Sequence, residues 1–373
     1  MAQFTRQNPQ DDQNISASHP GLRPAPLVTL ILLFYKQEGF IHEAVMGALN
    51  QTYSPLEIIL SDDCSPDRTF EILQDLVKSY EGPHKIILNR NPTNLRVCEN
   101  LNAAIALSSG ELIVTAGGDD ICYPNRCEVL AEEWLKPERK WHSICSNANL
   151  VNERGDFLGV YMDLRKSGVW ESAGVESALQ KGFVGVTGCT HAFSRSNYET
   201  FGPLPATAPG EDEILGFRSL LLGGIKWIPD LLLSYRKHPG GLYKDLAALR
   251  RMDKAARLSA TREDHVACKL RFNLYLDYIR VASEKGLITP HEADTFKGIL
   301  VNRLPYQQFS IDCKGSIFFA ASRLVSIIAS GEYRSGMLTH FKHTFLRFGI
   351  RTFMRRICGS DKSNDKMIGQ LNR

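Results

Sequence analysis

The sequence predicts an α/β fold, a mixed and mostly parallel sheet flanked by helices, followed by a helical C-terminal extension. Over about residues 27–238, short and nearly continuous apolar runs alternate with segments of helical spacing. Such runs are typical of strands buried on both faces of a parallel sheet. After about residue 241, long mixtures of apolar and charged residues indicate helices. The alternation implies βαβ units with right-handed crossovers.

The individual elements follow from local pattern. Strands are predicted at 28–34, 56–60, 85–88 and 112–115, and helices at 38–50, after Asp67, at 95–107 and from Glu211 onward. Asp67 is a candidate N-cap, because an aspartate carboxylate can accept a free backbone N–H of a first helical turn.

Composition limits the classes of function. The chain has 373 residues, 44 Lys+Arg against 41 Asp+Glu, and 43% hydrophobic residues, which is ordinary for a globular protein. Without a strong basic excess, nucleic acid is not expected as a partner. The nine cysteines contain no CxxC pair, which fits reduced cytosolic thiols better than disulfides or a zinc site. We therefore expect a cytoplasmic protein.

The composition also divides the chain into segments. We expect a disordered leader without a secretion signal, the α/β domain, a helical extension and a flexible tail, at residues 1–26, 27–240, 241–358 and 359–373. A turn-rich hinge at 237–241 separates the two central segments. No stretch approaches the ~20 consecutive apolar residues of a spanning helix.

Residues 314–358 have an unusual charge balance. They carry eight basic residues against one acid, Glu332, together with several phenylalanines. A basic, aromatic-rich helical segment can lie on an anionic membrane surface, here the inner face of the membrane. The alternative is a helical cap that packs its aromatic side chains on the main domain and exposes a basic face. Both interpretations stay open.

Two aspartate pairs follow predicted strands, and ligands of such sheets bind beyond the carboxyl ends of the strands. Asp62 and Asp63 can accept hydrogen bonds from a nucleotide, or can serve a turn. Asp119 and Asp120 repel each other unless a cation compensates, and Mg²⁺ typically uses one or two carboxylates plus substrate phosphates. The alternative for the second pair is a helix N-terminus ahead of Pro124.

A third acidic cluster, Glu211 to Glu213, opens a predicted helix, and acids are also common there for structural reasons. The small residues of 185–191 can line a pocket, with Cys189 packed in it. A nucleophile pair could be formed from His191, His238 and Cys189, but nothing in their spacing indicates one. No phosphate-loop, GxGxxG or GxSxG motif is present, so P-loop, dinucleotide and serine-hydrolase functions lack support.

Specific stretches of sequence carry a family resemblance. They are LNQTYSPLEIILSDDCSPD, NPTNLRVCENLNAAIALSSGELIVTAGGDDICYPNR, GEDEILGFRSLLLGGIKWIPD and YRKH. In this order they resemble glycosyltransferase family 2, the inverting enzymes with a Rossmann-like GT-A fold. The resemblance covers about residues 27–238 and stops beyond 241.

The resemblance implies a nucleotide-sugar site. Asp63 matches the carboxylate that reads the nucleotide base, with Phe34 and Tyr35 as the nearby pocket wall. Arg96, at the start of the third predicted helix, can reach the diphosphate, and a surface role for it stays open.

The resemblance also implies a divalent metal, Mn²⁺ or Mg²⁺. Asp119 and Asp120 match the DxD-type motif, with Asp120 as metal ligand and Asp119 contacting the ribose or assisting the metal. Which of the two is the direct ligand stays open. Asp212 matches the general base, and Glu211 a helper beside it.

The implied reaction is the transfer of a sugar, with inversion, from a nucleotide-diphosphate sugar to a glycan or lipid-linked acceptor, as in polysaccharide biosynthesis. One alternative is a catalytically silent nucleotide-sugar-binding module with a membrane-docking tail, which would have no use for a base. A nucleotidyltransferase would be expected to carry a Gly-rich basic loop after the first strand, where this chain has YKQEG.

Overall fold

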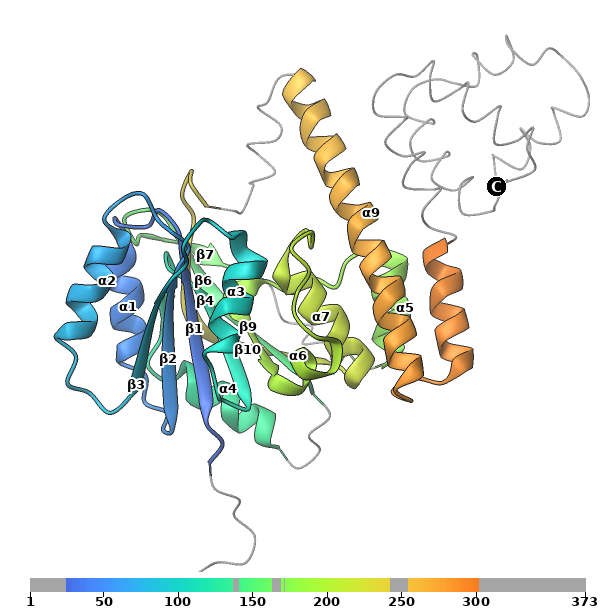
Figure 1. Cartoon of the computed structure of the whole chain (residues 1–373), viewed down its shortest axis with the longest axis horizontal. Coiled ribbons are helices and arrows are strands. Elements are labelled where there is room, and N and C mark those ends of the chain that lie inside the picture. The colour runs from blue at the N-terminus through green and yellow to red at the C-terminus, as the bar shows by residue number, and fades with distance from the viewer. Residues whose placement is uncertain (1–24, 137–140, 163–168, 171, 242–253, 302–373) are drawn as a thin grey trace, which may run out of the picture.

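One sheet forms the centre of the molecule (Figure 1). Its strands lie in the order β3-β2-β1-β4-β9-β6-β10-β5, with β7 on β6 and β8 on β10. The structure, a computed structural model, describes residues 25–136, 141–162, 169–170, 172–241 and 254–301.

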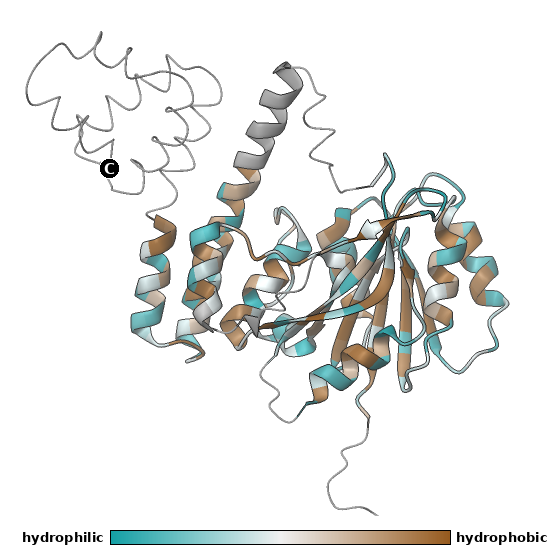
Figure 2. Ribbon diagram, turned by 180° about the vertical axis from the view of Figure 1, so that it is seen from behind, coloured by the Kyte–Doolittle hydropathy of each residue, from teal (hydrophilic) through white to brown (hydrophobic). Residues whose placement is uncertain are grey.

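The first half of the sheet is parallel. It contains β1 (Val28–Phe34), β2 (Leu56–Asp62), β3 (Lys85–Arg90) and β4 (Leu112–Gly117), joined through α1 (Ile41–Leu49), α2 (Thr69–Lys78) and α3 (Arg96–Ala106). Side chains alternate between the two faces: Leu30 and Leu32 of β1 pack with the α1 side, and Ile31 packs with the α3 side. Burial on both faces explains the continuous apolar runs, which Figure 2 shows as brown strands.

The second half is mixed. It contains β5 (Ile121–Cys122), β6 (Ser143–Val151), β7 (Phe157–Val160), β8 (Val169–Trp170), β9 (His191–Ser194) and β10 (Ile225–Arg236). The strand β9 lies antiparallel between β4 and β6, whereas β10 runs parallel to β6. The helical elements here are α4 (Arg126–Leu135), α5 (Ser172–Lys181), the 3₁₀ turn η2 (Gly188–Thr190), α6 (Arg195–Phe201) and α7 (Glu211–Leu222). The predicted mixed α/β sheet is thereby confirmed.

Several predicted boundaries shift by a few residues. The strand β2 continues to Asp62, so Asp62 belongs to the sheet rather than to the turn after it. The helix α2 begins at Thr69, and Asp67 Oδ1 accepts the Thr69 backbone N–H at 3.2 Å. Asp67 thus satisfies a donor of the first turn from two residues before the helix.

Helices after residue 241 pack on α7. They are α9 (Lys254–Glu284) and residues 290–301. Phe272, Tyr275, Ile279 and Phe296 share a core with Phe217 of α7. In Figure 1, the lower half of α9 lies beside α7.

Three predicted segments fall wholly or almost wholly outside the described residues: the leader except for residues 25 and 26, the basic segment 314–358 and the tail 359–373. No helix of the described ranges combines the length and the apolar character needed to cross a membrane.

Glu57 of β2 joins three neighbouring segments. It is 1% exposed and accepts hydrogen bonds from Thr29 Oγ1 at 2.7 Å, Gly110 N at 3.1 Å and Lys85 Nζ at 3.3 Å, as well as from Ser109 N. Burial acts to raise the pKa of Glu57, but these hydrogen bonds outweigh it and hold that pKa below the ordinary value. Because the folded-state pKa is lowered, the stabilisation is present above the ordinary carboxyl pKa and is lost as the pH falls through the folded-state pKa.

We expect Glu57→Gln to lower the free energy of unfolding by about 1–3 kcal/mol at pH 7, since a buried acceptor is replaced in part by a donor. Urea unfolding should show that the difference from the wild type shrinks as the pH is lowered towards ~4. Glu81→Gln, at an exposed position between α2 and β3, is the control and should leave stability unchanged. An equal loss in both variants would contradict this account.

Candidate functional site

The carboxyl ends of β1, β2 and β4 meet at one edge of the sheet. Asp63 N donates to Phe34 O at 2.9 Å, and Gly118 N donates to Leu33 O at 2.9 Å. The residues just after these strands therefore lie next to one another, as expected for parallel neighbours. This edge carries the candidate nucleotide residues and the candidate metal residues together.

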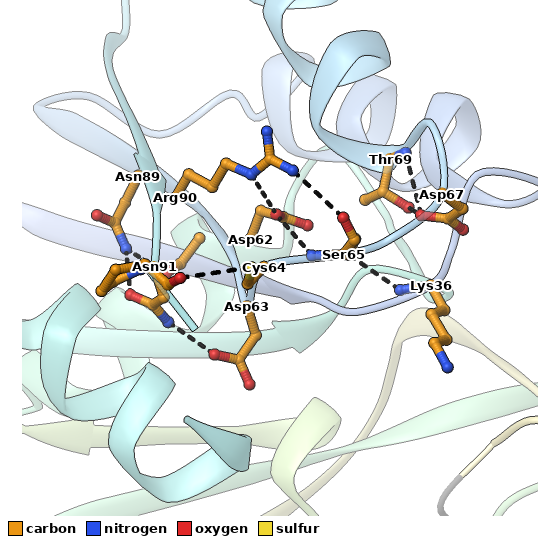
Figure 3. Close-up of polar contacts among 12 residues, drawn as sticks. Lys36, Asp62, Asp63, Cys64, Ser65, Asp67, Thr69, Asn89, Arg90 and Asn91 are labelled. Carbon is orange, nitrogen blue, oxygen red and sulfur yellow. Dashed lines mark hydrogen bonds and ion pairs between the residues drawn. The ribbon is translucent and has the colours of Figure 1, made fainter. Parts of the chain in front are cut away.

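Asp63 is 3% exposed and joins β2 to the loop before α3. Its Oδ1 accepts from Asn91 Nδ2 at 2.9 Å (Figure 3). The same oxygen accepts from Leu95 N at 2.8 Å, and Oδ2 accepts from Arg96 N at 2.8 Å. A carboxylate offers about four acceptor positions. One position on Asp63 therefore stays open for a further N–H donor.

Asp62 does not share this environment, because successive side chains of a strand point to opposite faces. It is fully buried; its Oδ2 accepts from Ser65 N at 3.0 Å and lies 3.6 Å from Arg90 Nε (Figure 3). Asp62 thus supports the turn after β2, which was the structural alternative for this pair.

Phe34 and Tyr35 differ in exposure. Phe34 is 1% exposed and belongs to the core on the α1 side of the sheet, whereas Tyr35 is 41% exposed. Of the two predicted wall residues, only Tyr35 presents its ring to a solute.

Three residues other than glycine adopt a positive φ at this edge: Lys36 (57°), Cys64 (58°) and Arg96 (68°). Such residues cost energy and are found disproportionately at functional sites. Arg96 is exposed; its backbone N–H is bound to Asp63, and its guanidinium makes no hydrogen bond or ion pair within the described part of the chain. It is therefore available to an anionic group.

The acidic pair after β4 is held by the end of β10. Asp120 is 2% exposed, and its Oδ1 accepts from Arg236 N at 3.0 Å. Asp119 Oδ2 lies 2.8 Å from His238 Nε2, and Asp119 O accepts from Arg236 Nε at 2.9 Å. Burial and the charge of Asp119 raise the pKa of Asp120 to about 8.

Arg236 connects this loop to α1. Its guanidinium pairs with Glu43, donates to Glu153 O at 2.9 Å and lies 5.0 Å from the Phe40 ring centroid. The Phe40 ring in turn lies 4.6 Å from that of His238. The YRKH stretch was part of the family resemblance, but no role was expected for Arg236 or His238; their position at the end of the last strand was the available signal.

The acidic pair fits a hard divalent cation. A Cβ on Gly117 would lie 3.0 Å from Asp120 Oδ2 and closer still to Asp119 Oδ1, so both carboxylates occupy space that a side chain would fill. Among the described residues, no three His, Cys, Asp or Glu side chains form a complete metal cage. A partial oxygen set is what Mg²⁺ commonly uses when substrate phosphates complete its shell.

The turn η2 links this pair to the third acidic cluster. Gly188 N donates to Asp212 Oδ2 at 3.2 Å, and the next residue, Cys189, is buried with its thiol hydrogen-bonded to Asp120. Arg126, fully buried, holds the turn by donating to Cys189 O at 2.6 Å and to Thr115 O at 2.8 Å. Sequence reasoning found the segment 185–191 but not Arg126.

Asp212 and Glu211 occupy the first turn of α7. Burial and the charge of Glu213 raise the pKa of Asp212 to about 6, and burial and the charge of Asp212 raise the pKa of Glu211. Asp212 therefore titrates close to neutral pH, in the range where a general base is effective.

Comparison with known proteins supports the family. Residues 29–151 match the model of glycosyl transferase family 2. The putative glycosyltransferase EpsE of Bacillus subtilis is 33% identical over 134 residues, 36% of this chain and 47% of that protein. An uncharacterized glycosyltransferase of Haemophilus influenzae is 36% identical over 105 residues, 28% of this chain and 32% of that protein. The chain thus spans less than half the length of these curated relatives.

A solved structure shows the same architecture over most of the chain. It is the mannosyltransferase PcManGT from Pyrobaculum calidifontis in complex with GDP-Man and Mn²⁺, at a TM-score of 0.50 and 17% identity, covering 88% of this chain and 83% of that one. Residues 29–151 thus match glycosyltransferase family 2, and the α/β architecture of the chain is that of a GT-A fold.

Proposed function

We propose that the protein transfers a sugar, with inversion, from a nucleotide-diphosphate sugar to a hydroxyl group of a glycan or lipid-linked acceptor. One observation carries the proposal: a single turn, Gly188–Thr190, contacts both Asp120 and the base candidate Asp212. The acid pair and the base are thereby held at one edge of the sheet, as a metal-assisted transfer requires.

The donor is proposed to bind over the ends of β1 to β3. Asp63 has an acceptor position for a base N–H, Tyr35 offers an exposed ring, and Arg96 offers an exposed cation for the diphosphate. The GDP-Man in the mannosyltransferase structure supports this class of donor.

Asp119 and Asp120 are proposed to hold the divalent cation, with His238 beside them on Asp119. When bound, such a cation neutralises the diphosphate as it leaves. The Mn²⁺ in the mannosyltransferase structure supports this assignment. Arg236 holds the Asp120 carboxylate through its backbone N–H and the Asp119 backbone carbonyl through its side chain.

Asp212 is proposed as the general base. Ionised, it accepts the proton of the acceptor hydroxyl as that oxygen attacks the anomeric carbon from the face opposite the leaving group. A single displacement of this kind inverts the configuration. Glu211, with its raised pKa, stays protonated beside it and limits the local negative charge.

A thermal-shift panel tests the donor site: UDP, GDP, dTDP and CMP, each with and without Mn²⁺ or Mg²⁺. We expect one nucleotide to raise the melting temperature only with metal, since a ligand at ~100 times its Kd stabilises by about 2.7 kcal/mol. The absence of a metal-dependent shift with every nucleotide would contradict the proposed donor site.

A further inference from the structure

Glu213, the third acid in the first turn of α7, neither holds the cation nor takes the proton in the proposed reaction, yet both of its oxygens are engaged. Oε2 accepts from Val184 N at 2.7 Å, and Oε1 accepts from Gly185 N at 3.0 Å. The same chain segment continues to Gly188, whose N–H binds Asp212. Glu213 therefore anchors one end of the segment whose other end holds the base.

Two side chains of α9 contact the same carboxylate. Tyr275 Oη donates to Glu213 Oε2 at 3.3 Å, and Arg271 Nη1 lies 3.9 Å from that oxygen. Arg271 Nη1 also donates to Gly182 O at 3.1 Å, so it binds the segment just before its anchored residues. Both side chains come from a helix outside the residues that match the family model.

Tyr275 is rigidly placed. It is fully buried, and its ring stacks on Phe217 of α7 with 3.7 Å between ring centroids and 13° between planes. Its hydroxyl is thereby fixed relative to the first turn of α7.

The anchored segment has little freedom to adjust. A Cβ on Gly216 of α7 would lie 2.8 Å from a Val186 methyl and 3.0 Å from a Val184 methyl. The segment thus lies directly on the α7 backbone. If its bonds to Glu213 are lost, the segment can move only along its own length, residues 184–188, and this movement displaces the Gly188 N–H that binds Asp212.

We propose that Tyr275 and Arg271 are positioning residues of the transfer reaction: they fix Glu213, Glu213 fixes residues 184–188, and that segment orients Asp212. The inference rests on the proposed function, in which Asp212 is the base. It makes α9 a part of the working site rather than a separate extension.

The first test compares two tyrosines of α9. Tyr275→Phe removes the hydroxyl that binds Glu213 and keeps the ring stack. Tyr278→Phe is the matched control, because its buried hydroxyl accepts from Arg218 Nη2 at 2.8 Å and makes no contact with Glu213. Turnover is followed as hydrolysis of UDP-glucose, UDP-N-acetylglucosamine or GDP-mannose with Mn²⁺, in which water replaces the acceptor hydroxyl, takes the sugar and releases nucleoside diphosphate. We expect Tyr275→Phe to lower kcat about tenfold, with KM for the donor unchanged, and Tyr278→Phe to stay within about twofold.

The second test uses charge. We expect Arg271→Gln to lower kcat and Arg271→Lys to recover most of it, because lysine keeps a cation beside Glu213. Equal kcat values for the two tyrosine variants, or an effect on KM alone, would overturn the proposal. So would equal losses in Arg271→Gln and Arg271→Lys.

Hydrogen–deuterium exchange of the full chain without ligand separates this inference from the proposed function. We expect Tyr275→Phe to speed exchange at the amides of Val184, Gly185 and Gly188, and Tyr278→Phe to leave them unchanged. If the wild type transfers no sugar but this difference is seen, the proposed function fails while the positioning of the segment stands. If exchange at these amides is the same in both variants, the positioning itself is refuted.

Discussion

Replacement of Asp212 by asparagine is expected to lower kcat by about 10²- to 10⁴-fold, the usual contribution of a general base. The asparagine oxygen can still accept from Gly188 N, and only the bond from Glu213 N within the first turn of α7 is lost, so the turn η2 and the donor site should keep their structure. Nucleotide affinity, measured by titration calorimetry with Mn²⁺, should therefore stay unchanged. Asp230→Asn, at an exposed position of β10, is the matched control and should keep full turnover. Full activity of Asp212→Asn would remove Asp212 from the role of base.

The pH dependence of the wild type adds a second readout of the same residue. Asp212 can take a proton only when it is ionised, and its pKa is raised to about 6 by burial and by the charge of Glu213. We therefore expect kcat/KM to rise with pH through about 6, and the residual rate of Asp212→Asn to lack this rise. A profile that is flat from about one pH unit below to about two units above the expected midpoint would contradict the assignment.

The parallel half of the fold was predictable because its signal is local. Strands buried on both faces carry continuous apolar runs, such as 28–34, and the intervening helices carry their own spacing. Each strand end also marks the sheet edge, so the placement of Asp63 and of Asp119-Asp120 followed from topology alone.

The family resemblance assigned the nucleotide role to Asp63, but the different environments of Asp62 and Asp63 depend on where β2 ends. Once the strand continues to Asp62, alternation places the two side chains on opposite sides, and only Asp63 reaches the loop before α3. The local pattern ended the strand two residues earlier, because aspartates are rare in strands and common in turns.

The contacts that join the site were not predictable, because they are between residues far apart in sequence. No hydrophobic periodicity in the sequence indicates these contacts. Examples are the pairing of β9 between β4 and β6, the bond from Arg236 N to Asp120 and the contact of Tyr275 with Glu213. Buried cations such as Arg126 are similarly hidden, because an arginine in a helix normally indicates a solvated face.

Asp120→Asn is expected to abolish the metal-dependent part of nucleotide binding. The variant keeps an oxygen that can accept from Arg236 N, so the loop after β4 should hold its shape, while the pair loses one negative charge. With a cation that supplies several kcal/mol of transition-state stabilisation, turnover should fall by about 10²-fold or more. The thermal shift given by the best nucleotide should become the same with and without Mn²⁺.

Asp119→Asn distinguishes the two members of the pair. The Asp119 carboxylate contacts His238. Asp119→Asn therefore leaves the Asp120 carboxylate and the His238 imidazole as metal ligands. Asp120→Asn leaves only an Asp119 carboxylate that is already hydrogen-bonded to His238. If Asp120 is the direct ligand, Asp119→Asn should weaken the metal dependence without removing it, and Asp75→Asn, on the exposed face of α2, should not affect it. The reverse order of effects would make Asp119 the direct ligand, and an unchanged metal dependence in both variants would place the cation elsewhere.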